Sequence, residues 1–189
     1  MEVPAFFIQR HSYLYQSFLP GLRKKFPEQA FREKPHPKTQ PIVWLLWHMA
    51  RAEDAGLSHF VWQIPELYDQ KWRDFMHTDI FHYGTSMTDD EVEAFARGVD
   101  VNVVLDYQQA VGARTLQEID KLNPEYLDEV LDEEMVKDVV TGKGIASEKA
   151  QWVIPHYVGK TRGWALCHFG LTHNFRHFGQ VVLVKKMLG

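Results

Sequence analysis

The stretch from Thr161 to Leu188 constrains the fold most, because it has helical periodicity and almost no continuous polar face. Its apolar residues on one side are Leu166, Phe169, Val181, Val184 and Leu188, and those on the other side are Trp164, Cys167, Leu171, Phe175, Phe178 and Val182. A helix that is apolar all round lies at the centre of a protein or at a subunit interface. The sequence therefore predicts that both sides of this helix are covered, either at the centre of the protein or at a subunit interface. It also predicts a homodimer, the alternative being a monomer whose loops cover the second side.

Three more helical segments are expected, which gives an all-α four-helix bundle. The first covers about residues 5–26, where Pro20-Gly21 should kink or shorten it. The second covers about 41–63, because a proline suits the first turn and Pro65 follows the end. The third begins at a capping box, Thr88 to Glu91, and continues towards residue 122. A long connection over 64–87 joins the second helix to the third, and a short extra helix precedes the last.

Length and composition fit a single domain over residues 1–189. A chain of this length can bury about 70% of its unfolded surface, so it needs no disulfide or metal to build a core. A net charge of −4 offers no basic surface for nucleic acid, and the longest apolar run is too short to span a membrane. One cysteine excludes an intramolecular disulfide, and the N-terminus lacks the plan of a signal peptide, so a cytoplasmic location is expected.

Three histidines form a candidate metal site. His173 and His177 are four residues apart, which places them about 6 Å apart along a helix and about 40° apart around it. His48 lies in the apolar run 44–50 and would reach the same point from the second helix. Three neutral imidazoles suit zinc or nickel and leave coordination positions open, as in a reactive site. On the residues alone, a hydrogen-bonded pair of core histidines is an equal alternative.

The segment 173–180, together with His48 in a tryptophan-rich second helix, resembles the DinB/YfiT-like family of four-helix proteins. In that family, one histidine of the second helix and two of the last helix bind a divalent metal. The resemblance thus implies His48, His173 and His177 as metal ligands, and it also implies a dimer. The family often has an arginine directly after the last ligand, whereas this chain has Phe178 there and Arg176 one residue before the ligand.

These features predict a divalent-metal-dependent enzyme that acts on a small molecule. A cation held by three imidazoles can lower the pKa of bound water or keep a bound thiolate deprotonated, and either would be the nucleophile. Cys167 lies about 240° around the helix from His173 and should point away. A low-molecular-weight thiol is therefore expected, with a transferase acting on an electrophile, since the family includes thiol-dependent transferases and isomerases. The alternatives are a metal-dependent hydrolase using bound water, a non-catalytic metal or small-molecule binding module, and a metal-free bundle.

Few polar residues are candidates to support the three histidines. Glu53 and Asp54 lie about 140° and 240° around the helix from His48, which favours a solvated face. Asn174 and Arg176 flank the ligands but are expected to project away from them.

The connection over 64–87 is a second candidate for a functional role. An irregular connection of this length could cap the metal pocket and select a substrate. For individual residues such as His77 and His82, a packed surface loop is the favoured interpretation.

Overall fold

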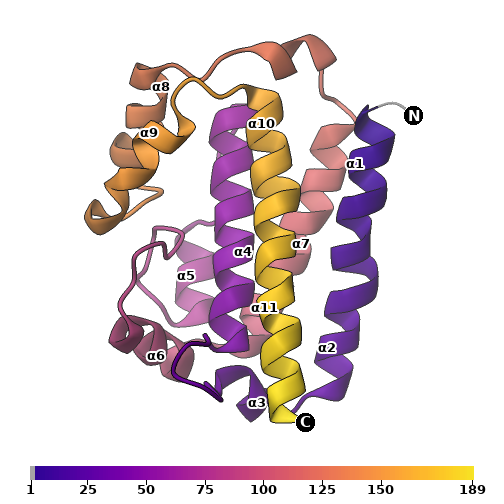
Figure 1. The fold of residues 1–189 in the computed structure, drawn as a ribbon, viewed down its shortest axis with the longest axis vertical. Helices are drawn as coiled ribbons and strands as arrows, with labels where there is room; N and C mark the ends of the chain where they lie inside the picture. Colours follow the sequence, from indigo (N-terminus) through magenta and orange to yellow (C-terminus); the bar gives the residue numbers. More distant parts are fainter. Residues whose placement is uncertain (1–2) are drawn as a thin grey trace.

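The structure is a computed structural model that describes residues 3–189, and Figure 1 shows a bundle of long helical segments. It confirms the predicted all-α bundle. Four segments form it: α1 (Val3–Ser12), η1 (Tyr13–Phe18) and α2 (Leu19–Lys25); α4 (Ile42–Leu57) and η2 (Ser58–Trp62); α7 (Val101–Ile119); and α10 (Arg162–Cys167), η6 (His168–Thr172) and α11 (His173–Leu188). None of the helices described over residues 3–189 is long and apolar enough to cross a membrane.

Helix α4, and not the last helix, is the covered centre of the bundle. Every residue of α4 is buried. It packs against both α7 and α11, and Figure 1 shows it between α10–α11 on one side and the shorter helices α5 (Gln70–Met76) and α6 (Asp89–Gly98) on the other. In α11 only Asn174, Val181 and Val184 are buried. Within one chain the last helix is therefore not covered all round, because α4 has the longer apolar run and takes the inner position.

The first helical segment continues through Pro20 without a break. A proline lacks the backbone N–H, and its ring crowds the carbonyl four residues earlier. The segment just before it, η1, is a π-helical turn in which the backbone hydrogen bonds skip one more residue. The wider turn makes room for the ring, so a local change of hydrogen bonding replaces the predicted kink or shortening.

The predicted third helix is two helices, α6 (Asp89–Gly98) and α7. Val99 is extended between them, and the Asp100 side chain accepts hydrogen bonds from the backbone N–H groups of Asn102 and Val103. This side chain starts a new helix, as aspartate does when it competes for backbone donors. The capping box at Thr88 is present as predicted and begins α6.

The connection between α4 and α6 is more ordered than its sequence suggested. It contains α5 (Gln70–Met76), whose first turn is capped by Asp69. Buried Arg51 of α4 donates hydrogen bonds to Glu66 Oε2 at 2.6 Å and to the carbonyl of Phe81 at 2.8 Å. These bonds fix both ends of the connection against the bundle.

The shorter elements surround the four long segments. They are α3 (Glu28–Arg32), η3 (Pro124–Asp128), α8 (Glu133–Lys137), η4 (Asp138–Gly142), η5 (Glu148–Val153) and α9 (Ile154–Tyr157). The short extra helix expected before α10 corresponds to η3. The elements α8, η4, η5 and α9 follow it before α10 begins.

Candidate metal centre

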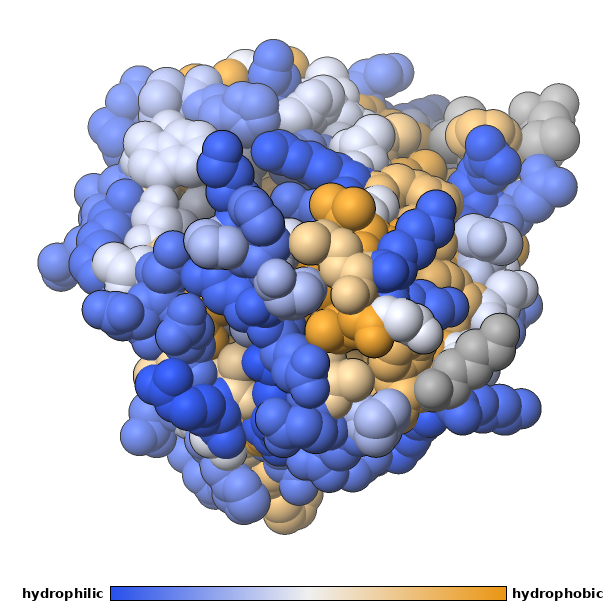
Figure 2. All heavy atoms as spheres, turned by 60° about the horizontal axis from the view of Figure 1, so that its bottom comes forward, coloured by the Kyte–Doolittle hydropathy of each residue, from blue (hydrophilic) through white to orange (hydrophobic). Residues whose placement is uncertain are grey.

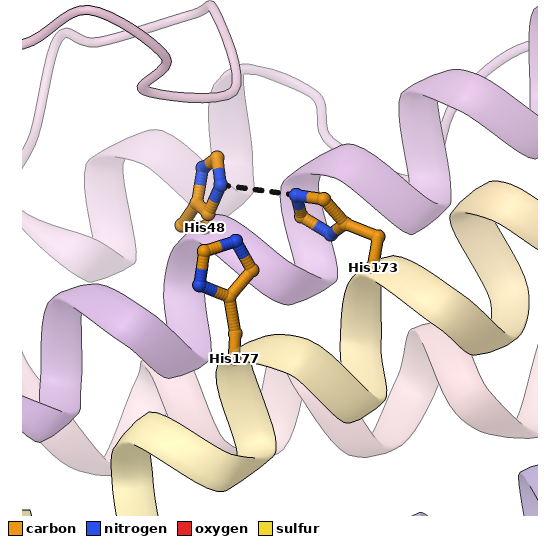
Figure 3. A group of neighbouring side chains, drawn as sticks. All are labelled: His48, His173 and His177. Carbon is orange, nitrogen blue, oxygen red and sulfur yellow. Dashed lines mark hydrogen bonds between the residues drawn. The ribbon is translucent and has the colours of Figure 1, made fainter.

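His48, His173 and His177 converge on one point between α4 and α11 (Figure 3). Their ligand atoms all lie within 4.8 Å of one another, and the Nε2 atoms of His48 and His173 are 3.2 Å apart. Two imidazole nitrogens on one tetrahedral zinc are about 3.3 Å apart, given zinc–nitrogen bonds of about 2.0–2.1 Å. A hydrogen-bonded pair would also explain the shortest separation, but it would not require a third imidazole aimed at the same point.

Glycines let the helices that carry the histidines approach closely. A Cβ atom on Gly56 of α4 would overlap the ring of Phe169 in η6. A Cβ atom on Gly170 would lie 2.6 Å from the ring of Phe7 in α1. The absence of side chains at these two positions brings α4, η6 and α1 together, and this packing sets where His173 starts α11.

Hydrogen bonds orient two of the three rings. His48 Nδ1 bonds to the backbone carbonyl of Tyr83, which can only accept, so this nitrogen carries the proton and Nε2 keeps its lone pair. His177 Nδ1 bonds to Gln180 Oε1 at 2.6 Å, which likewise leaves Nε2 facing the other histidines. Such bonds from the second ring nitrogen are typical of histidines that bind metals. The Nδ1 atom of His173 is buried and has no partner among the described residues.

Burial keeps all three imidazoles neutral. It lowers the pKa of His48 to about 3, with a further contribution from His177. Burial also places the pKa of His173 well below its usual value, and it lowers that of His177. Neutral imidazole is the form that binds a metal, so no proton has to leave at pH 7. The donor set therefore fits a divalent ion.

A cavity of about 420 Å³ adjoins the three histidines. Its lining residues come from α4 and the loop before it, the connection, α6, η5, α9, η6 and α11. They are Gln40, Trp44, His48, Ala52, Tyr83, Gly84, Thr85, Ser86, Met87, Val92, Trp152, Val153, His156, Tyr157, His168, Phe169, His173, Arg176 and His177. The connection thus borders the cavity through residues 83–87. His77 and His82 are not among the lining residues, in line with a packing role.

Glu53 and Asp54 are buried, so the expected solvated face was wrong. Glu53 accepts hydrogen bonds from His11 Nε2 at 2.7 Å and from the hydroxyl of Thr115 at 2.6 Å, and the side chains of Tyr15 and Asn174 also donate to it. Both residues do point away from His48, as their angles around the helix predicted. However, this side of α4 is covered by α1 and α7 and is not open to solvent. Asn174 points there and away from the metal centre, as expected.

Arg176 lines the cavity, contrary to the expectation that it projects away from the ligands. His168 also lines the cavity, and no pattern in the sequence selects that residue. His168 opens the π-helical turn η6, in which residues five apart share one side of the helix. Its ring lies 5.8 Å from that of His173, centroid to centroid. An α-helical projection would have placed these two rings on different sides. Cys167 is exposed and is not among the lining residues.

The fold and the three histidines define a class: helical-bundle proteins with a histidine group that could hold a divalent ion. The sequence profile described as the DinB superfamily matches residues 19–181, so the chain belongs to that superfamily. A crystal structure described as a conserved protein from Enterococcus faecalis has the same fold, with a TM-score of 0.72 over 99% of this chain and 97% of that one. Its sequence is 20% identical. Among proteins with curated descriptions, none matches this chain.

Proposed function

We propose that the protein is an enzyme that uses a divalent metal, zinc or nickel, bound by His48, His173 and His177. We further propose that it transfers a low-molecular-weight thiol to an electrophilic small molecule. The observation that carries the proposal is the convergence of three neutral imidazoles at the wall of a cavity large enough for a small molecule. A structural zinc site would usually be closed by a fourth protein ligand.

The cavity favours a thiol over water as the nucleophile. A divalent ion lowers the pKa of a bound thiol and keeps it as a thiolate near neutral pH. The only cysteine, Cys167, does not line the cavity, so the thiol must come from outside. No described lining residue is an aspartate or glutamate. The cavity therefore lacks the carboxylate base that activates water in many zinc hydrolases.

Metal analysis of protein purified without an affinity tag tests the site. We expect about one zinc or nickel ion per chain, and we expect His48→Ala and His177→Ala to lose it, because two imidazoles bind far more weakly than three. His36→Ala is the matched control, since His36 is exposed and does not line the cavity. Stoichiometric metal in both site variants would contradict the proposal.

Thiol transfer is tested with metal-loaded protein, a panel of small thiols and an activated aryl chloride. A carbon–sulfur bond forms, the carbon–chlorine bond breaks, chloride leaves, and the thiol proton passes to solvent. We expect thiol consumption that disappears in His177→Ala. Turnover of an ester without any thiol would favour a hydrolase instead. Full metal occupancy without turnover would favour a binding module.

A further inference from the structure

The cavity beside the three histidines is lined by cationic and neutral side chains only. Arg176 lines it, and so do five of the ten histidines in the chain: His48, His156, His168, His173 and His177. None of the described lining residues is acidic, although the chain as a whole has 25 acidic and 21 basic residues. The exclusion of carboxylates is therefore a property of this cavity and not of the overall composition.

Arg176 has no hydrogen-bond or ion-pair partner among the described residues, and its side chain is exposed. Other arginines of the chain do have carboxylate partners: Arg23 pairs with Asp106 at 2.7 Å, and Arg162 pairs with Glu129 at 2.7 Å. Arg176 thus lines the cavity without a carboxylate paired to it among the described residues.

We propose that Arg176 binds a carboxylate of the ligand, so that the cavity takes a small anionic molecule lying between Arg176 and the three histidines. The guanidinium is suited to this, because its planar donors match the two oxygens of a carboxylate. Three neutral ligands also leave the charge of a divalent ion uncompensated, which increases the demand for an anion. That the other end of the ligand is a thiol rests on the function proposed above.

The cavity walls between Arg176 and the three histidines suit an apolar middle part of the ligand. Trp44 stacks on the His48 ring with centroids 4.8 Å apart and forms part of the lining. Trp152 is 62% exposed, also lines the cavity, and donates a hydrogen bond from Nε1 to the hydroxyl of Ser86 at 3.0 Å. Large aromatic faces of this kind bind apolar groups. The carboxylate can belong to the thiol or to the electrophile, since both would occupy the same cavity.

The test measures binding of two thiols to cobalt-loaded protein, in which a thiolate–cobalt bond gives an absorption band. The probes are 3-mercaptopropionate and its methyl ester, which differ in the charge of the carboxyl group and by one methyl group. We expect the acid to bind about tenfold more tightly than the ester, the scale of a charge-assisted hydrogen bond. Arg176→Gln should abolish this preference, and Arg176→Lys should restore part of it.

Lys186→Gln is the matched control, because Lys186 is an exposed cation on the same helix and does not line the cavity. It should keep the full preference for the acid. Cobalt content should be unchanged in all these variants, since Arg176 is not one of the three proposed ligands. A preference for the acid that survives in Arg176→Gln would overturn the proposal.

A second arm identifies which molecule carries the carboxylate. If the two thiols bind equally, benzoate is titrated calorimetrically into protein already saturated with the ester. Binding of benzoate that is lost in Arg176→Gln would support the subsite and assign the carboxylate to the electrophile. If neither the preference for the acid nor the binding of benzoate depends on Arg176, the proposal is wrong. If no thiolate band forms at full cobalt occupancy, the thiol role fails, and benzoate binding without thiol still decides the role of Arg176.

Discussion

At Glu53, one fully buried carboxylate connects α4 to three other segments of the bundle. Its hydrogen-bond donors are His11 in α1, Tyr15 in η1, Thr115 in α7 and Asn174 in α11. Because Asn174 directly follows His173, the same carboxylate also fixes the rotation of α11 that turns His173 and His177 towards His48. A residue on the far side of α4 thus contributes to the geometry of the metal centre.

We predict that Glu53→Ala lowers the free energy of unfolding by about 3–5 kcal/mol. The substitution leaves several buried donors without an acceptor and opens a cavity among them. Urea unfolding followed by circular dichroism measures the change. Glu134→Ala is the control, since Glu134 is exposed, and it should stay within about 0.5 kcal/mol of wild type. A loss of less than about 1 kcal/mol in Glu53→Ala would contradict a stabilising role for this network.

At the scale of the helices, close packing of α4 against η6 depends on Gly56. We predict that Gly56→Ala destabilises the protein by about 1–3 kcal/mol, because the added methyl overlaps the ring of Phe169. The measurement is the free energy of unfolding. Gly21→Ala is the control, since Gly21 lies inside α2 with nothing within 4 Å of an added Cβ. There the better helix propensity of alanine should stabilise the protein by up to about 1 kcal/mol. Equal effects of the two substitutions would rule out the packing argument.

Sequence periodicity predicted the four long helical segments well, because apolar spacing and proline or capping signals mark where most of them begin and end. It also selected His48, His173 and His177, since four-residue spacing is preserved in α11. It failed where the backbone departs from a regular α-helix. The π-helical turns η1 and η6 and the break at Val99 have no clear signature in hydrophobic spacing. Arg176 and His168 were missed because their positions depend on tertiary contacts and on the turn in η6.

At the scale of the whole molecule, the apolar core does not depend on a metal. It consists of two clusters of buried side chains, one including Trp47 and Tyr107 and the other including Phe60 and Phe169. Neither cluster needs an ion to hold its members together. Metal binding should therefore add stability to a protein that is already folded, unlike a zinc finger.

We predict that removing the metal with a chelator leaves the helical circular dichroism signal intact and lowers the melting temperature. A ligand that binds only the folded state stabilises it in proportion to the logarithm of its free concentration. Adding zinc back should restore the melting temperature of wild type, but not that of His177→Ala. Loss of the helical signal on chelation would show that the bundle needs the metal to fold.

The homodimer stays a prediction. Figure 2 shows that the face at the lower end of the bundle is mostly hydrophilic, with the largest area of apolar side chains to the right of the centre. In the C-terminal half of α11, Leu183 is 53% exposed and Met187 is 45% exposed. Further up the helix, the ring of Phe178 lies 3.9 Å from that of Phe18, centroid to centroid, so η1 covers part of the second side.

His48 and His173 are 125 positions apart in the chain, and this separation determines when the centre can exist during protein synthesis. A domain generally folds as a unit, so it completes its packing only once all of its segments have been synthesised. Helix α4 emerges early with one histidine of the group, whereas α11 is translated more than a hundred positions later. A nascent chain cannot bring the three histidines together before α11 has left the ribosome, and binding of a metal by all three has to wait until then.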